Sequence, residues 1–131
     1  MKAGPQLNAL VAERVMGFKQ FSQPPDYDGL HGGEPVLFPP GMDPVKSGYK
    51  YPPKGKVAFA ALVPNYLNSI ADAWPVVKEL CTDGVEVQIH VDLLGTHVAV
   101  IDGEAVLADV TEKDAPYAIC LAALKTKGVE L

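Results

Sequence analysis

Two histidines and an aspartate, His90, Asp92 and His97, lie close together in a stretch that alternates apolar and polar residues. A hairpin turn at Leu94-Gly95 would place Asp92 opposite His97 on the neighbouring strand, with His90 on the same face. Such a pair can act as a general base with its orienting carboxylate. No serine, cysteine or lysine nucleophile is near in the sequence, so a surface pair that only stabilises the sheet is the favoured interpretation. We therefore predict no catalytic residues and no enzymatic activity.

The residues able to bind a metal ion are scattered along the chain. These residues are His31, His90, His97, Cys81 and Cys120. None of them has the short paired spacing of a zinc site. Both cysteines fall in predicted helices, where cysteine is commonly a small buried hydrophobic residue. The sequence therefore predicts neither a metal site nor a cofactor.

Trp74 is the only tryptophan of the chain. With Ile70, Val77 and Leu80 it shares one face of a predicted amphipathic helix. A large aromatic side chain on such a face typically anchors a helix to a sheet. We therefore expect Trp74 to be buried in the core.

The start of this helix has two solutions because of Pro75. With Ser69 as the N-cap, Pro75 lies inside the helix, removes a hydrogen bond and bends it. With Asp72 as the N-cap, Pro75 falls in the first turn, where no amide donor is needed. The sequence leaves both starts open, and Gly84 is predicted to terminate the helix.

Three strands are expected after this helix. Residues 85–91 alternate apolar and polar side chains, as a half-buried strand does. The second strand carries Val98 and Val100 on its apolar face. Asp102-Gly103 predicts a tight hairpin turn, and the third strand follows over residues 105–110.

Helices are predicted at both ends of the chain. Residues 6–17 form an amphipathic N-terminal helix, and Asp114 caps a C-terminal helix that ends before Gly128. The fold class predicted is α+β, a helix–three-stranded antiparallel meander–helix sandwich with an additional N-terminal helix and a long Pro/Gly-rich arm.

The arm covers residues 24–56. Eight prolines and six glycines fall within residues 24–55, which excludes a long helix or a central strand. Its aromatic residues, Tyr27, Phe38, Tyr49 and Tyr51, offer area to bury, and a short extended piece is expected near Val36–Phe38. The arm either lies on its own domain or binds a groove on a partner. The following residues, 57–63, fit a buried strand or a helical turn equally well.

Composition limits the class of protein. The chain has 131 residues, of which 48% are hydrophobic, with a net charge of −5. This predicts one domain spanning 1–131 with its folded core in 57–131, and excludes full-length disorder. It does not favour non-specific binding to nucleic acid or to an anionic membrane. Without a predicted signal sequence or membrane span, we expect a cytoplasmic protein.

Three segments carry a resemblance to a known family. They are LVAERVMGF at 10–18, PNYLNSIADAWPVVKEL at 64–80 and DAPYAICLAALKTKGVEL at 114–131. They resemble the phage ABA sandwich domain family, small proteins encoded by bacteriophages and prophages. The resemblance implies a helix–sheet–helix sandwich and a phage origin, without catalytic residues, because the family has no established function. Pro75 and the length of the arm depart from the family pattern.

Three functions follow as hypotheses. The first is a non-enzymatic phage accessory protein that binds itself, as a dimer, or a host or phage protein. The second is sequestration of a nucleotide signal, although Arg14 is the only arginine available to grip phosphate. The third is binding of double-stranded RNA, suggested by the order of elements. Acidic residues replace the expected lysine cluster before the last helix, so RNA is the least favoured partner.

Overall fold

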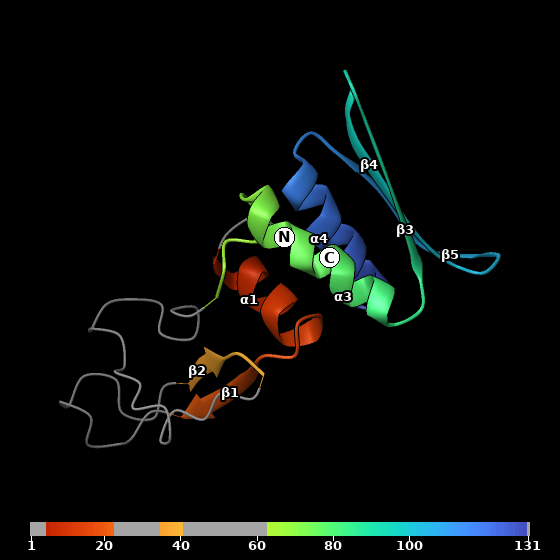
Figure 1. Ribbon diagram of the computed structural model, residues 1–131. Helices are drawn as coiled ribbons and strands as arrows, with labels where there is room; N and C mark the ends of the chain where they lie inside the picture. Colours follow the sequence, from red (N-terminus) through yellow and green to blue (C-terminus); the bar gives the residue numbers. More distant parts are fainter. Residues whose placement is uncertain (1–4, 23–34, 41–62, 131) are drawn as a thin grey trace.

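The computed structural model describes residues 5–22, 35–40 and 63–130 (Figure 1). Eight helices and strands are found in these ranges: α1 Pro5–Arg14, β1 Lys19–Ser22, β2 Pro35–Phe38, α3 Ile70–Thr82, β3 Glu86–Asp92, β4 Gly95–Asp102, β5 Ala105–Glu112 and α4 Ala115–Thr126. Tyr27, Tyr49, Tyr51, His31 and most of the arm lie outside the described residues, as do residues 57–62. The extended piece expected near Val36–Phe38 is confirmed as β2, which pairs antiparallel with β1.

The larger sheet has the order β3-β4-β5 and is antiparallel throughout, which confirms the predicted meander. The second hairpin predicted from Asp102-Gly103 is present, but its turn residues are Gly103 and Glu104, one residue later than expected, because Asp102 ends β4 and pairs with Ala105. Gly103 has a positive φ of 62°. The ladder between β4 and β5 contains a bulge. Val100 pairs with Ala108 and Ile101 with Val106, so Leu107 is an extra residue in β5.

The first hairpin turn differs from the prediction by one residue. Leu93 and Leu94 form the turn, and the Leu94 N–H donates to Asp92 Oδ1 at 2.8 Å. Gly95 is instead the first residue of β4, where φ is 135° and an added Cβ would lie 2.5 Å from the carbonyl oxygen of Glu112. The close approach of β5 therefore requires glycine inside the strand.

The helices cover one face of this sheet. Helix α4 packs on β4 and β5, α3 packs on α4 and β3, and α1 packs on α4 (Figure 1). The core lies between these layers and contains the largest fully buried side chains, Leu7, Leu37, Leu67, Leu80, Ile119, Leu124, Val11, Val76 and Val98. The α+β fold class and the chain order helix, meander, helix are thus confirmed.

Helix α3 begins after Ser69, the first of the two predicted starts. The Ser69 Oγ accepts a hydrogen bond from the Asp72 N–H at 3.3 Å, while Asp72 Oδ2 accepts one from the Asn65 N–H at 3.1 Å. Pro75 lies inside the helix. One capping bond at the N-terminus, and one bond that ties the preceding segment to the first turn, accompany the loss of the helical hydrogen bond that Pro75 removes.

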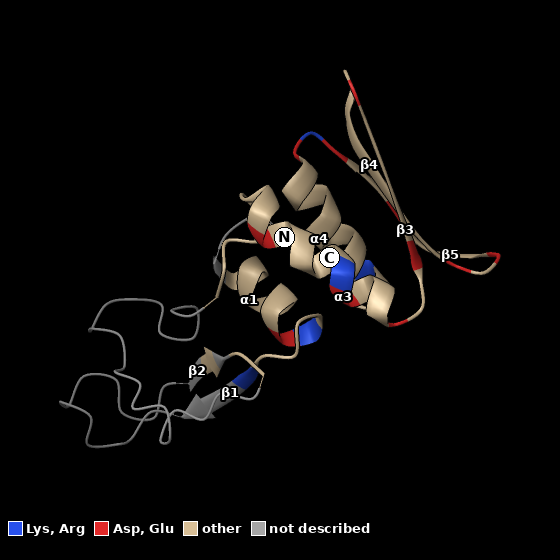
Figure 2. Cartoon of the chain, viewed as in Figure 1, with Lys and Arg blue, Asp and Glu red and all other residues tan. Residues whose placement is uncertain are grey.

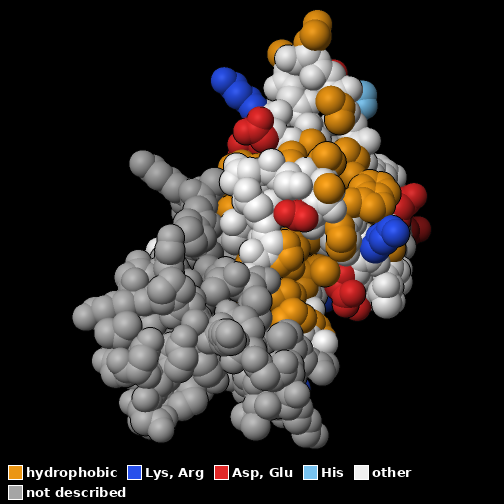
Figure 3. All heavy atoms as spheres, turned by 60° about the vertical axis from the view of Figure 1, so that its left-hand side comes forward, with side chains coloured by type: hydrophobic (Ala, Val, Ile, Leu, Met, Phe, Trp, Pro, Cys, Tyr) orange, Lys and Arg blue, Asp and Glu red, His pale blue; other side chains and the backbone are white. Residues whose placement is uncertain are grey.

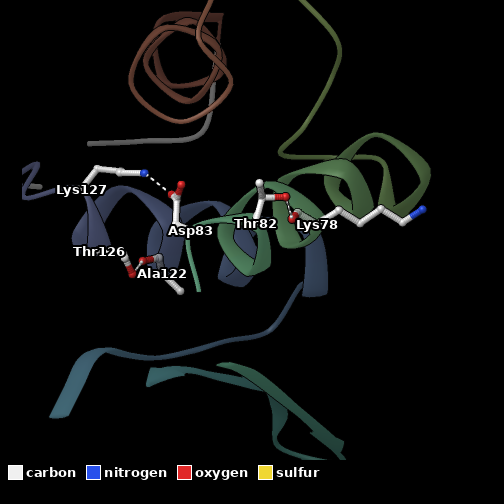
Figure 4. Close-up of polar contacts among 6 residues, drawn as sticks. All are labelled: Lys78, Thr82, Asp83, Ala122, Thr126 and Lys127. Atoms are coloured by element: carbon white, nitrogen blue, oxygen red, sulfur yellow. Dashed lines mark hydrogen bonds and ion pairs between the residues drawn. The ribbon is translucent and has the colours of Figure 1, made fainter. Parts of the chain in front are cut away.

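The C-terminal ends of α3 and α4 lie side by side (Figure 4). Lys127 Nζ is 2.5 Å from Asp83 Oδ2, and the hydroxyl of Thr126 donates to the Ala122 carbonyl. Gly84 and Gly128 follow these ends with positive φ angles, which confirms both predicted terminators. The ion pair therefore joins the C-terminal ends of α3 and α4.

Helix α1 is attached to the start of α3 by one polar side chain. Asn8 Oδ1 accepts from the Leu67 N–H at 3.1 Å, and Asn8 Nδ2 donates to Asn65 Oδ1 at 3.3 Å. The helix ends at Arg14, earlier than the predicted residue 17, and Gly17 has a positive φ of 78°. The predicted helix and its glycine terminator are both present.

Candidate functional site

The histidine and aspartate residues gather on the face of the sheet opposite the helices. His90 pairs directly with His97, and Asp92 pairs with Gly95, so the predicted Asp92–His97 pair is wrong. The carboxylate that faces His97 instead belongs to Asp109 on β5. The register differs because the turn lies at Leu93-Leu94, which moves every partner of β3 by two positions along β4.

Each histidine has its own carboxylate. His97 Nε2 lies 2.5 Å from Asp109 Oδ1, and His90 Nε2 lies 3.3 Å from Asp92 Oδ2. The side chains of all four residues are exposed, from 41% for His97 to 72% for His90. Water therefore screens both pairs, which limits each to a small contribution to sheet stability.

In the described part of the chain this cluster does not have the ligand set of a metal site, and both cysteines lie on helices. Among the described residues no group of three or more histidine, cysteine, aspartate or glutamate side chains is placed to hold a metal ion. Cys81 is exposed on α3, whereas Cys120 is buried in α4, where burial raises the pKa of its thiol to about 12. A thiol with that pKa stays protonated at neutral pH and is a poor nucleophile.

A hollow of about 330 Å³ lies between β5 and α4. It is lined by Asp109, Val110, Thr111, Glu112, Tyr117, Leu121 and Lys125. Two carboxylates and one ammonium group give this lining a net negative character. A phosphate group would be repelled here more than it is attracted.

Trp74 is 49% exposed, so the prediction of a buried anchor is wrong. The residues of α3 that are buried are Ala73, Val76, Val77 and Leu80. The buried stripe is turned relative to the predicted one, because α3 packs against α4 as well as against β3. Ile70 and Trp74 consequently lie at the margin of the buried stripe, where they meet solvent.

Strand β3 also exposes apolar side chains. Val87 is half-buried, but the exposed fraction rises to 36% at Ile89 and 65% at Val91, and Leu93 and Leu94 in the turn are almost fully exposed. The helices therefore cover only the first part of β3, and the rest of the hairpin projects beyond them. We call the exposed apolar residues of α3 and this hairpin the β3 surface: Ile70, Trp74, Ile89, Val91, Leu93 and Leu94.

The β3 surface was missed by the sequence interpretation, although one signal for it was present. Leu93 and Leu94 occupy a hairpin turn, where polar residues and glycine are usual. Figure 3 shows hydrophobic side chains gathered over the helices and at the upper tip of this face of the molecule. Exposed apolar groups of this extent commonly mark a site of interaction.

The comparisons with known proteins agree with this fold. The model of the phage ABA sandwich domain matches residues 9–124. The chain therefore belongs to the phage ABA sandwich domain family. It is similar in fold to a crystal structure of a phage protein from Bacillus cereus, with a TM-score of 0.63 and 24% sequence identity over 100% of this chain and 92% of that one. No curated protein matches the chain.

Proposed function

We propose that this phage protein acts by binding a protein partner, without catalysis, and that the β3 surface is its binding site. The observation that carries the proposal is the exposure of the six apolar side chains of this surface, the larger of two groups of exposed large apolar residues in the described part of the chain. The smaller group is Val106 and Leu107 on β5. Burying such groups against a partner is favourable by about 25 cal/mol for each Å² removed from water.

The histidine cluster supports a binding function rather than a catalytic one. A general base works within reach of a bound substrate, in a site that excludes water. His97 and Asp109 are instead open to solvent on a sheet face that no described element covers. Their contact joins a side chain of β4 to one of β5, as a pair that stabilises the sheet does.

Charge favours a protein partner over a nucleic acid. Strands β3, β4 and β5 carry aspartate and glutamate but neither lysine nor arginine (Figure 2). Phosphate groups are bound chiefly by lysine and arginine side chains. Of the described chain, no helix has both the length and the apolar character that crossing a bilayer requires.

The test uses the phage or prophage that encodes the protein. We expect the double variant Leu93→Ser/Leu94→Ser to reproduce the phenotype of a gene deletion, such as a change in phage yield. The matched control is Val106→Ser/Leu107→Ser, which removes two exposed apolar side chains from β5. It should leave the phenotype unchanged, as should His97→Ala.

Circular dichroism melting would show that each variant is folded. A deletion phenotype from His97→Ala, with none from Leu93→Ser/Leu94→Ser, would overturn the binding hypothesis in favour of chemistry at the cluster.

A further inference from the structure

No described strand pairs with the outer edge of β3. In the order β3-β4-β5, β3 pairs with β4 alone, through a regular ladder that runs from Glu86 to Asp92. Proteins usually protect an exposed edge with a bulge, a proline or a lysine. The other edge, β5, has a bulge at Leu107, whereas β3 has none of these features. Strand β3 is therefore the edge that is suited to pairing with another strand.

The two faces of β3 differ in polarity. Val87, Ile89 and Val91 lie on the face that the helices partly cover, because their partners on β4 include the buried Val98 and Val100. Residues 86, 88, 90 and 92 lie on the other face and are polar. A strand added at this edge must repeat that alternation to continue both faces, and β3 of a second copy does so.

We propose that the partner of the β3 surface is a second copy of this chain, an inference that rests on the proposed function. The two β3 strands pair antiparallel across a twofold axis at Gln88, so that two three-stranded sheets become one continuous sheet. Val87 then faces Ile89 of the other copy. Glu86 faces His90 of the other copy, once on each side of the axis.

The polar residues of β3 select this register among those that keep the apolar faces aligned. With the axis at Ile89, Glu86 would face Asp92 of the other copy twice, which places like charges opposite each other. With the axis at His90, the two His90 side chains would face each other, and the strand would pair partly with turn residues. Only the axis at Gln88 avoids facing carboxylates and places each Glu86 opposite a side chain, His90, that can donate a hydrogen bond to it.

The helical layer fits the same arrangement. Helix α3 is the helix that packs on β3, while α4 lies over β4 and β5. Extension of the sheet beyond β3 therefore brings the two α3 helices toward each other across the axis. The exposed Ile70 and Trp74 side chains and the uncovered Ile89 and Val91 would then lose contact with water, which offsets the cost of association.

Cysteine cross-linking tests the register. In a Cys81→Ser background, Gln88→Cys places two thiols directly opposite each other across the axis, about 4.5–5.5 Å apart between Cα atoms, where a disulfide forms readily. We expect mild oxidation to convert most of this variant to a covalent dimer. The control is His90→Cys, whose two thiols would be separated by four residues, about 13 Å along the strand, and should remain monomeric.

A Gln88→Cys variant that stays monomeric, or a His90→Cys variant that cross-links in its place, would overturn the proposal.

Charge exchange provides a second measurement. Glu86→Lys and His90→Glu should each weaken the dimer about fivefold to tenfold in sedimentation equilibrium, because each change affects two symmetric cross-strand pairs. The double variant should recover most of the affinity. Glu104→Lys makes the same charge change as Glu86→Lys at the exposed β4–β5 turn and should have no effect.

A wild-type protein that is monomeric at high micromolar concentration would overturn the self-association. If Leu93→Ser/Leu94→Ser still reproduced the deletion phenotype, the β3 surface would bind a different protein and the proposed function would stand.

Discussion

The backbone N–H of Leu67 donates to the side-chain Oδ1 of Asn8 at 3.1 Å, which joins two residues 59 positions apart in the chain. Leu67 is buried in the core, and Asn8 lies on α1. The same asparagine donates to Asn65, whose N–H in turn reaches Asp72 in the first turn of α3. One polar side chain thus orients the N-terminal helix on the helical layer.

Asn8→Ala should lower the free energy of unfolding by about 1–2 kcal/mol, because the Leu67 N–H loses its acceptor in a partly buried place. Asn8→Asp keeps the Oδ1 acceptor and is the matched control, with an expected loss of less than half that amount. Urea denaturation measures both. Equal losses in the two variants would show that the hydrogen bond to Leu67 is not the stabilising contact.

The exposure of Trp74 makes a prediction about stability. Leu80→Ala should cost about 2–5 kcal/mol, since Leu80 is fully buried in the same helix. Trp74→Ala should cost much less in the monomer, because about half of the side chain already contacts water. Chemical denaturation of both variants at low protein concentration gives the comparison, and a Trp74→Ala loss as large as that of Leu80→Ala would contradict the exposed position.

Gly95 tests the close approach of β4 and β5. Gly95→Ala should destabilise the protein by about 1–3 kcal/mol, because alanine is strained at a φ of 135° and its Cβ would meet the Glu112 carbonyl. Gly84→Ala is the control, with a positive φ of 88° but open space around the position. In thermal melts, the Tm of Gly95→Ala should be well below the Tm of Gly84→Ala. The reverse order of the two Tm values would argue against the close approach.

Alkaline pH should destabilise the protein. Burial raises the pKa of Cys120 from 9.0 to about 12. Burial is also the largest of the causes that raise the pKa of Tyr66 from 10.0 to about 12. The unfolded chain therefore releases these protons at lower pH than the folded one. The stabilising contribution is complete below pH 9 and is lost as the pH rises toward about 12.

Cys120→Ala and Tyr66→Phe should each flatten this alkaline loss in urea titrations between pH 8 and about 11. As an independent check of burial, a thiol reagent should label Cys81 in the folded protein and label Cys120 only after unfolding. An unchanged pH profile in both variants would assign the alkaline loss to other groups.

The sequence by itself determined the local elements. Alternation in β3, the Asp102-Gly103 signal for the second hairpin and the glycines after α3 and α4 all identified structures that are present. These signals are local, because the side-chain period and the backbone freedom of glycine depend only on neighbouring residues. Resemblance in three segments also identified the family to which the chain belongs.

Only the tertiary structure decided which apolar residues meet water. Trp74 and Val91 have the sequence pattern of buried residues, yet α3 is turned toward α4 and the helices end before the tip of β3. The neighbours of His97 were likewise set by strand pairing: the turn at Leu93-Leu94 places His90 opposite it, and the pairing of β4 with β5 brings Asp109 to it. Burial and strand register depend on where distant elements pack, and no local pattern in one sequence contains that information.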